Sequence, residues 1–313
     1  MALESGTYIK DLVSTNPPGT DAISQGDDHL RLIKSTIQAS FPSNTNAPTV
    51  PDIAGNGNKF LQVNSGATAT AWIAVRTAGS LNRATFAYKD ADEIYIGAGE
   101  YDLDGTTTAA YSWDSQLTFQ IGSGGSNAAS SAAGTSQWQY LYMDDSVISA
   151  SPLVAASFLN ATTAPTYNQS KQGWYNGSDR CIFAFYIDSS GNIEKWFHDG
   201  GDYVMLSDDY NNGGTTASAS YAAITIMMPS FVNKAECNVY IDGQIATARS
   251  YQYWRVTGSD GEHLLGRIED DDAEYVVNNV TIYTDSSNQI DILNNTAPNV
   301  KPYTAGWYIP GGM

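Results

Sequence analysis

The stretch RCIFAFYIDSSGNIEKWFHDGG, residues Arg180–Gly201, decides the fold class of this chain. Its first half is rich in β-branched and aromatic side chains, which favour a pleated and half-buried surface. Asp188–Asn192 then brings together Asp, Ser, Gly and Asn, the residues that form turns. A short aromatic run follows. Two such runs joined by a turn predict a β-hairpin.

Strand signals of this kind recur from about residue 85 to residue 208, with no helical period between them. In DEIYIGAGEYDLDG, Ile94 and Ile96 alternate with Tyr95 before glycines turn the chain. The runs YSWDSQLTFQIG and WQYLYMDD alternate in the same way. Strands at this spacing predict an antiparallel sandwich or barrel.

The run YNNGGTTASAS, residues 210–220, is poor in hydrophobic residues and carries paired glycines, which predicts a domain boundary. Further strand candidates follow it, among them ECNVYIDGQIATAR, in which Asp242-Gly243 is a two-residue turn signal. We therefore expect a mainly β chain with two antiparallel β-sandwich-like domains, over residues 81–209 and 210–313.

The N-terminal region has a different pattern, because its apolar residues follow a helical period from about residue 21 to residue 40. Ile23, Leu30, Ile33 and Ile37 are spaced by seven, three and four residues, which is the a/d seam of a coiled coil. Two heptads are too few to form a stable coiled coil alone. The seam must therefore pack on identical copies of the chain, as in a homotrimer, or on its own domain.

Residues 43–80 are rich in Asn, Ala, Thr and Gly and predict a small linker unit. Within it, Phe60, Leu61 and Val63 form one strand candidate and residues 69–75 form another. An isolated hairpin is marginal in water, so this unit needs neighbours. The expected organisation is thus 1–42 for attachment and trimerisation, 43–80 for the linker hairpin, and the two β domains.

The net charge of −18, from 15 basic and 33 acidic residues, excludes some classes of partner. An acidic surface repels nucleic acid and anionic membranes, so we expect no nucleic-acid partner. No apolar run reaches the roughly 18 residues that span a bilayer, so we expect no membrane insertion. Cys181 and Cys237 match no disulfide framework or zinc pattern, and we expect free thiols.

No pattern of catalytic residues is visible. His29, His198 and His263 lie in three separate segments, and no nucleophile elbow, zinc-protease or phosphate-loop motif is present. Acidic runs such as DADE at 90–93 and EDDDAE at 269–274 offer oxygen ligands but lack the spacing of a calcium loop. We therefore expect no catalytic residue, no metal and no cofactor, and a chain that is not an enzyme.

Two aromatic clusters are candidates for contact with a glycan. In GWYNGSDR, Trp174 and Tyr175 lie beside amide, carboxylate and guanidinium groups; in YQYWR, Tyr251 and Tyr253 share one strand face while Trp254 takes the other. The tyrosine pair is an exposed stacking platform and Trp254 is core, or the reverse. The alternative for both clusters is a core strand preceded by a turn.

The first 42 residues, MALESGTYIKDLVSTNPPGTDAISQGDDHLRLIKSTIQASFP, resemble the leader of tail fibres and tail-associated proteins of tailed bacteriophages. The shared features are the ALESGTYI start, the NP turn and the DDHLRLIKS…FP helix. The family usually forms homotrimers, attaches to the virion by the N-terminus and meets the host with the C-terminus.

The resemblance implies a virion structural protein, a tail fibre or tail-attached receptor-binding protein. Such a protein is assembled in the host cytoplasm and located in the virion tail. It docks on other tail proteins through the N-terminus and presents β domains to a host cell-surface glycan or protein. A head fibre or capsid decoration protein, or a glycan-cleaving tailspike, is the alternative.

Overall fold

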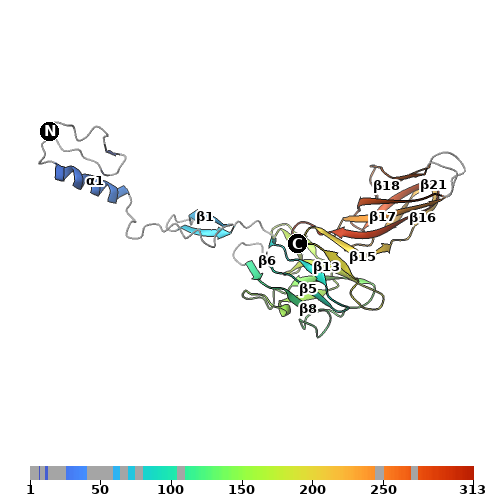
Figure 1. The fold of residues 1–313 in the computed structure, drawn as a ribbon, viewed down its shortest axis with the longest axis horizontal. Helices are drawn as coiled ribbons and strands as arrows, with labels where there is room; N and C mark the ends of the chain where they lie inside the picture. Colours follow the sequence, from blue (N-terminus) through green and yellow to red (C-terminus); the bar gives the residue numbers. More distant parts are fainter. Residues whose placement is uncertain are drawn as a thin grey trace. The chain divides into compact units, whose positions relative to one another are not determined.

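The computed structural model describes residues 7, 11–12, 26–40, 59–63, 70–74, 80–103, 110–243, 250–268 and 274–313. The chain divides into two compact units, 1–75 and 76–313. The fold is mainly β, with antiparallel sheets and one short α-helix among the described residues (Figure 1). The predicted fold class is therefore confirmed for the single chain.

The smaller unit contains helix α1 (Gly26–Ser40) and a two-stranded sheet, β1 (Lys59–Val63) with β2 (Thr70–Ala74). The two strands are antiparallel, with Leu61 opposite Trp72, as the linker sequence predicts. Asp27 and Asp28 lie in the first turn of α1, where the helix dipole favours negative charge. The first residues of the predicted helix, including Ile23, lie outside the described residues.

The first part of the larger unit forms three antiparallel sheets. Two are three-stranded, in the orders β3-β6-β7 and β4-β5-β8, and one is five-stranded, in the order β10-β9-β13-β12-β11. The strands are β3 (Ser80–Asn82), β4 (Phe86–Tyr88), β5 (Glu93–Ile96), β6 (Gly99–Asp102), β7 (Ala110–Trp113), β8 (Leu117–Gln120), β9 (Gln137–Met143), β10 (Phe158–Ala161), β11 (Thr166–Asn168), β12 (Gly173–Asn176) and β13 (Asp179–Ile187), with the short 3₁₀ helix Ala155–Ser157 between β9 and β10.

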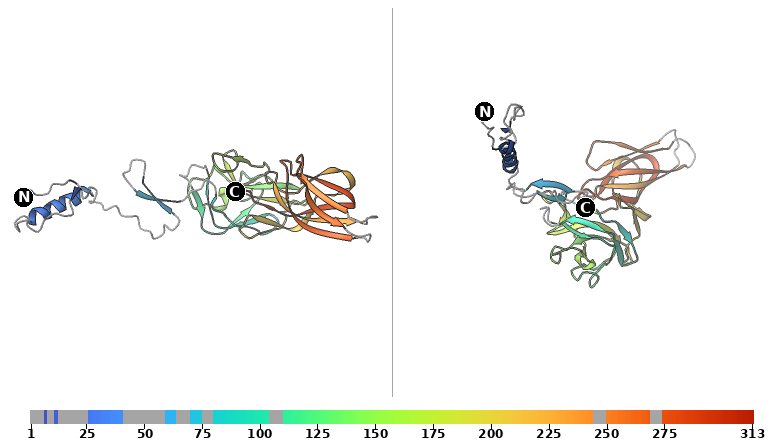
Figure 2. Two further views of the ribbon diagram at one scale, coloured as in Figure 1. Left: turned by 90° about the horizontal axis from the view of Figure 1, so that it is seen from above. Right: turned by 60° about the vertical axis from the view of Figure 1, so that its left-hand side comes forward.

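The second part is one eight-stranded sheet that folds on itself in a sandwich-like way. In both views of Figure 2 the strands coloured orange and red, which belong to this sheet, lie together. The strands are β14 (Trp196–His198), β15 (Tyr203–Asn211), β16 (Thr215–Thr225), β17 (Lys234–Gly243), β18 (Ser250–Val256), β19 (His263–Ile268), β20 (Glu274–Tyr283) and β21 (Gln289–Tyr308).

Strand β21 is the centre of this sheet. Its first half pairs with β16 on one side and β18 on the other, so that Ile292 lies opposite both Ala222 and Trp254. Its second half pairs with β15 and β17, and the start of β16 also reaches this half, where Thr215 lies opposite Val300. Ile290, Ile292 and Val300 of β21 are fully buried, because a strand with partners on both edges turns one face to the core.

The predicted boundary near residue 210 does not separate two units. Residue 210 lies inside β15, which pairs with β21, and the two parts share one hydrophobic core. The ring of Trp307, from β21, lies 5.9 Å from that of Phe183 and 6.1 Å from that of Trp138. The paired glycines at 213 and 214 therefore mark a bend between two strands of the same sheet.

One predicted hairpin and one predicted turn also differ. Asp188–Asn192 forms the turn, with Asp188 Oδ1 accepting bonds from the amides of Ser190 and Asn192, but only the bridge Ile187–Ile193 pairs across it. The next strand, β14, pairs with β15 in the other sheet. Asp242-Gly243 is not a turn, because both residues pair with β20 as part of β17.

Candidate functional site

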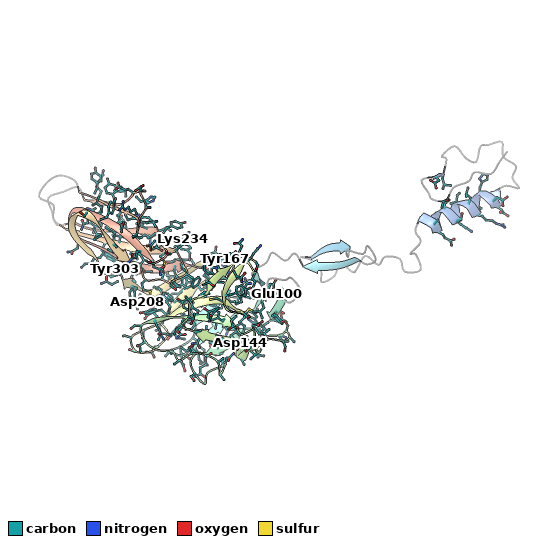
Figure 3. All side chains as sticks on the ribbon, turned by 180° about the vertical axis from the view of Figure 1, so that it is seen from behind. Glu100, Asp144, Tyr167, Asp208, Lys234 and Tyr303 are labelled. Carbon is teal, nitrogen blue, oxygen red and sulfur yellow. The ribbon has the colours of Figure 1, made fainter. Side chains whose placement is uncertain are left out.

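A cleft of about 460 Å³ lies in the larger unit, where β11 and β12 meet two loops of the second part. The side chain of Tyr167 on β11 is 45% exposed and meets Trp174 of β12 edge-on, with ring centroids 5.4 Å apart (Tyr167 is labelled in Figure 3). Tyr167 and Trp174 are directly opposite in the strand register, which explains why the rings meet. The lining residues are Ala164, Pro165, Thr166, Tyr167, Trp174, Ser230, Phe231, Val232, Asn233, Thr284, Asp285 and Ser286.

The loop before β17 supplies the opposite wall. Phe231 packs against Trp174, with ring centroids 5.0 Å apart, and against Tyr140, at 5.6 Å. Tyr140 also holds the loop through its hydroxyl, which lies 3.1 Å from Ser230 Oγ. Burial raises the pKa of Tyr140, so this phenol stays protonated as a hydrogen-bonding group.

Polar groups line the same cleft. The amide of Thr284 donates to Asn233 O at 3.0 Å, which joins the two loops. Thr284 is only 7% exposed, and its Oγ1 has no hydrogen-bond partner within the part of the chain that the structure describes. Asp285 Oδ1 accepts bonds from the amides of Ser287 and Gln289, which fixes the carboxylate at the edge of the cleft.

Trp174 is hydrogen-bonded to the segment Gly311–Met313, which we call the strap. The indole Nε1 of Trp174 donates to Gly311 O at 3.0 Å. Tyr175 is buried and its hydroxyl accepts a bond from Arg180 at 2.8 Å. Of the predicted pair, Trp174 therefore faces the cleft, whereas Tyr175 belongs to the interior.

The second predicted cluster lies on a sheet face. The rings of Tyr251 and Tyr253 stack with centroids 6.4 Å apart, and both side chains are half-buried. Trp254 is 5% exposed and stacks on His263 at 4.9 Å. The structure thus places the tyrosine pair outside and Trp254 in the core, which is one of the two alternatives that strand alternation allowed.

Arg255 follows on the same outer face as the tyrosine pair. Its guanidinium lies 3.9 Å from the centroid of the Tyr221 ring, and its Nε donates to Asp291 Oδ2 at 3.2 Å. Neither the cleft nor the larger cavity beside β14 and β15 is lined by Tyr251 or Tyr253, and we call the outer surface of β18 the flat face.

A larger cavity, of about 560 Å³, lies beside β14 and β15. Phe197 and Met205 are opposite one another in the strand register, and both are exposed. Most of its wall is apolar, and His198 is already bonded to the amide of Phe86 and to Gly201 O. This cavity therefore offers fewer polar groups to a sugar than the cleft does.

The acidic run at 90–93 brings Asp90, Asp92 and Glu93 within 4.8 Å of one another. Lys89 forms an ion pair with Glu93 and lies 3.6 Å from Asp90, while Asp92 accepts a bond from Gln120. Each of the three carboxylates thus has a protein group as a neighbour. Run 269–274 lies outside the described residues except for Glu274.

The two cysteines are free and buried. Burial raises the pKa of Cys237 to about 12 and raises the pKa of Cys181 as well, so both thiols stay protonated and act as small apolar groups.

The predicted seam of α1 is exposed in the single chain. Leu30 is 57% exposed, and Ile33 and Ile37 are 41% and 43% exposed. No helix among the described residues is long and apolar enough to cross a membrane. The exposed seam is available to either predicted partner, identical copies of the chain or its own domain.

No family model and no curated protein matches this chain. Among solved structures, the chain is similar to an exo-β-1,3-galactanase from Phanerochaete chrysosporium with β-1,3-galactotriose, at 13% identity and a TM-score of 0.20 over 80% of this chain and 63% of that one. The same enzyme with galactose gives 11% identity and a TM-score of 0.21, covering 79% and 74%. The structure of infectious bursal disease virus strain Gx gives 9% identity and a TM-score of 0.16, covering 74% and 68%.

The expectation that the chain is not an enzyme needs correction. It rested on missing motifs, and the similar solved structures include a glycoside hydrolase, whose chemistry needs only two carboxylates that no short motif identifies. TM-scores near 0.2 also assign no activity to this chain. The absence of catalytic motifs therefore does not exclude enzymatic activity, and these similarities do not assign one.

Proposed function

We propose that this chain is a structural protein of a bacteriophage virion, a homotrimeric tail fibre or tail-attached receptor-binding protein, and that it binds a host cell-surface glycan in the cleft. The observation that carries the proposal is that exposed Tyr167 and half-buried Trp174 line one cleft together with the polar groups of Asn233, Thr284 and Asp285. Sugars stack their apolar faces on aromatic rings and bond their hydroxyls to amide, hydroxyl and carboxylate groups.

The virion assignment is supported by the leader at residues 1–42 and by the exposed seam of α1. Under this proposal the N-terminus docks on other tail proteins. Three copies bury Leu30, Ile33 and Ile37 at the trimer axis. One open cleft binds a sugar weakly, and three clefts on one trimer raise the effective affinity through local concentration. The net charge of −18 favours a neutral glycan over a strongly anionic one.

Binding is tested by immobilising the protein on beads and adding purified bacterial surface polysaccharides. The unmodified chain should retain a polysaccharide that a Tyr167→Ala, Trp174→Ala double variant loses. The matched control is Tyr251→Ala with Tyr253→Ala, which removes two rings from the flat face. Retention by the cleft variant together with loss by the control would move the site to β18. Assaying reducing ends in the same incubation separates binding from cleavage.

Assembly is tested on α1. Leu30→Asp with Ile37→Asp should weaken a trimer, because unpaired charges would be buried in the seam. Ser35→Asp with Gln38→Asp adds the same charge to exposed positions of the helix and serves as the control. Sedimentation of the Leu30, Ile37 variant as an unchanged trimer would remove the seam from the assembly. Labelling of the chain in images of the virion separates a tail location from a head location.

A further inference from the structure

The strap, Gly311–Met313, is bound by three side chains from distant parts of the larger unit. Trp174 Nε1 donates to Gly311 O at 3.0 Å, Arg180 Nη2 donates to Gly312 O at 2.6 Å, and Arg83 Nε donates to Met313 O at 3.1 Å. Three successive main-chain carbonyls are thus each bonded to a different donor. The side chain of Met313 is fully buried in the shared core.

The arginine at the centre of this contact is fully buried. Besides Gly312 O, Arg180 donates to Asp102 O at 2.7 Å and to the hydroxyl of Tyr175 at 2.8 Å. A buried guanidinium depends on such acceptors, because leaving a buried charge unpaired is costly. Seating the strap therefore satisfies a donor that sits directly beside β12.

The strap also touches the backbone that leads into Trp174. Gly312 has φ +90°, and a Cβ at this position would lie 2.9 Å from Gln172 O and 3.2 Å from Gly173 Cα. Gly173 itself has no room for a side chain, since its Cβ would lie 2.8 Å from Arg180 Nη2. The strap, the start of β12 and Arg180 are therefore in close contact, with no room for a further side-chain atom at Gly173 or Gly312.

We propose that the strap positions Trp174 in the cleft, so that the affinity of the cleft depends on whether the strap is seated. When the strap is seated, the indole N–H is bonded to Gly311 O, and the ring is fixed against Tyr167 and Phe231. When the strap is released, the indole loses this bond and the ring turns about its side-chain torsions. The effect on binding rests on the proposed glycan function, whereas the effect on the ring does not.

Two neighbouring glycines give a matched test. Gly312→Ala must strain the strap, because alanine at φ +90° is unfavourable and its Cβ meets backbone atoms. Gly311→Ala is the control, since a Cβ there has nothing within 4 Å. Both are made in the full chain labelled with fluorotryptophan, and Trp174→Phe assigns the resonance of Trp174 in fluorine NMR.

We expect Gly312→Ala to shift or broaden the Trp174 resonance. The resonance of Trp113, the buried last residue of β7, should stay unchanged. Retention of the polysaccharide bound by the unmodified chain should fall by about tenfold, the size of one lost hydrogen bond. Gly311→Ala should behave as the unmodified chain does. An unchanged Trp174 resonance in Gly312→Ala would overturn the proposal, and so would a changed resonance with full retention.

Gly312→Ala may be replaced by a measurement on the unmodified chain if the variant fails to fold. The strap should protect the indole N–H of Trp174 from hydrogen exchange, and exchange at the rate of free tryptophan would overturn the proposal. If the unmodified chain retains no polysaccharide, the proposed function fails. The NMR comparison then still decides whether the strap holds the ring.

Discussion

The two aromatic clusters of the larger unit differ in the surroundings of their arginines. Arg180, at the end of GWYNGSDR, is fully buried and donates to main-chain carbonyls and to Tyr175. Arg255, at the end of YQYWR, lies on the surface, stacked on Tyr221 and paired with Asp291. Similar residue types therefore form an enclosed support behind Trp174 and a flat outer face around Tyr253.

The difference between the two clusters comes from segments that are distant in the sequence. Loops 229–233 and 284–286 and the strap close around Trp174, whereas β18 lies within the sheet between its paired strands β19 and β21. A concave site needs walls from several segments, and a strand alone provides one wall.

The largest effect is expected from Arg180→Met, which removes the donor to Gly312 O, Asp102 O and the Tyr175 hydroxyl. These acceptors lose a donor, at roughly 1–3 kcal/mol for each buried group left unsatisfied, and we expect a loss of about 3–5 kcal/mol in the free energy of unfolding. Arg255→Met is the control and should cost about 1 kcal/mol or less, since it breaks a partly exposed ion pair. Urea unfolding measures the free energy of unfolding of both variants. Equal losses would show that Arg180 contributes no more to stability than Arg255 does.

The two tryptophans should separate stability from binding. Trp254→Ala should destabilise the fold by about 3 kcal/mol or more, because it empties a buried site. Trp174 is half-buried, so Trp174→Ala should cost about 2 kcal/mol less. Thermal unfolding gives the order, and a larger loss for Trp174→Ala would place that ring in the core.

A smaller effect is expected from Tyr251→Ser with Tyr253→Ser. The stacking of the two half-buried rings should contribute about 0.5–1.5 kcal/mol beyond the area that they bury. Polysaccharide retention should remain unchanged, because these rings line no part of the cleft. A loss of retention at unchanged stability would show that the flat face, too, takes part in binding.

The smallest effect is a pH dependence from Asp179 in the first cluster. Burial raises the pKa of this carboxyl, and the nearby Asp144 and Asp145 raise it further. A pKa that is higher in the folded than in the unfolded chain means that the folded state binds the proton more tightly. The contribution of Asp179 to stability therefore rises as the pH falls through the folded pKa towards the unfolded value.

Asp179→Asn should remove this increase, and urea unfolding at about pH 7 and about pH 3 measures it, because these values bracket the ordinary carboxyl pKa of 3.8 from which Asp179 and Asp188 are shifted. Asp188 provides the opposite sign. The amide of Asn192 and other turn amides lower the pKa of its carboxyl, so its contribution is lost as the pH falls through the folded pKa. Asp188→Asn should therefore reduce acid destabilisation, and the same sign for both variants would contradict the assignment.

Local pattern was enough to predict part of this molecule. Alternation placed Ile94 and Ile96 inside and allowed Trp254 to be buried opposite the tyrosine pair. The antiparallel pairing of β1 with β2 follows from the two predicted strand runs. These features depend on neighbours in the sequence, which single-sequence reasoning can weigh.

The cleft could not be predicted in this way. Phe231 and Asp285 reach Trp174 from more than 50 residues away, and their own segments look like ordinary loops. The boundary near residue 210 was misplaced because no local signal shows that Trp307 packs on Phe183. A Pro-Gly-Gly sequence is typical of a tail, so the role of the strap emerges only from its contacts.

The long strand β21 has a consequence for how the molecule is made. It forms the centre of the eight-stranded sheet and is the last strand in the described sequence. During synthesis, β15 to β18 therefore leave the ribosome long before the partner that joins them. Such late, long-range pairing slows folding and leaves unpaired strand edges that can aggregate. Refolding from urea should accordingly be slow, and its yield should fall as protein concentration rises.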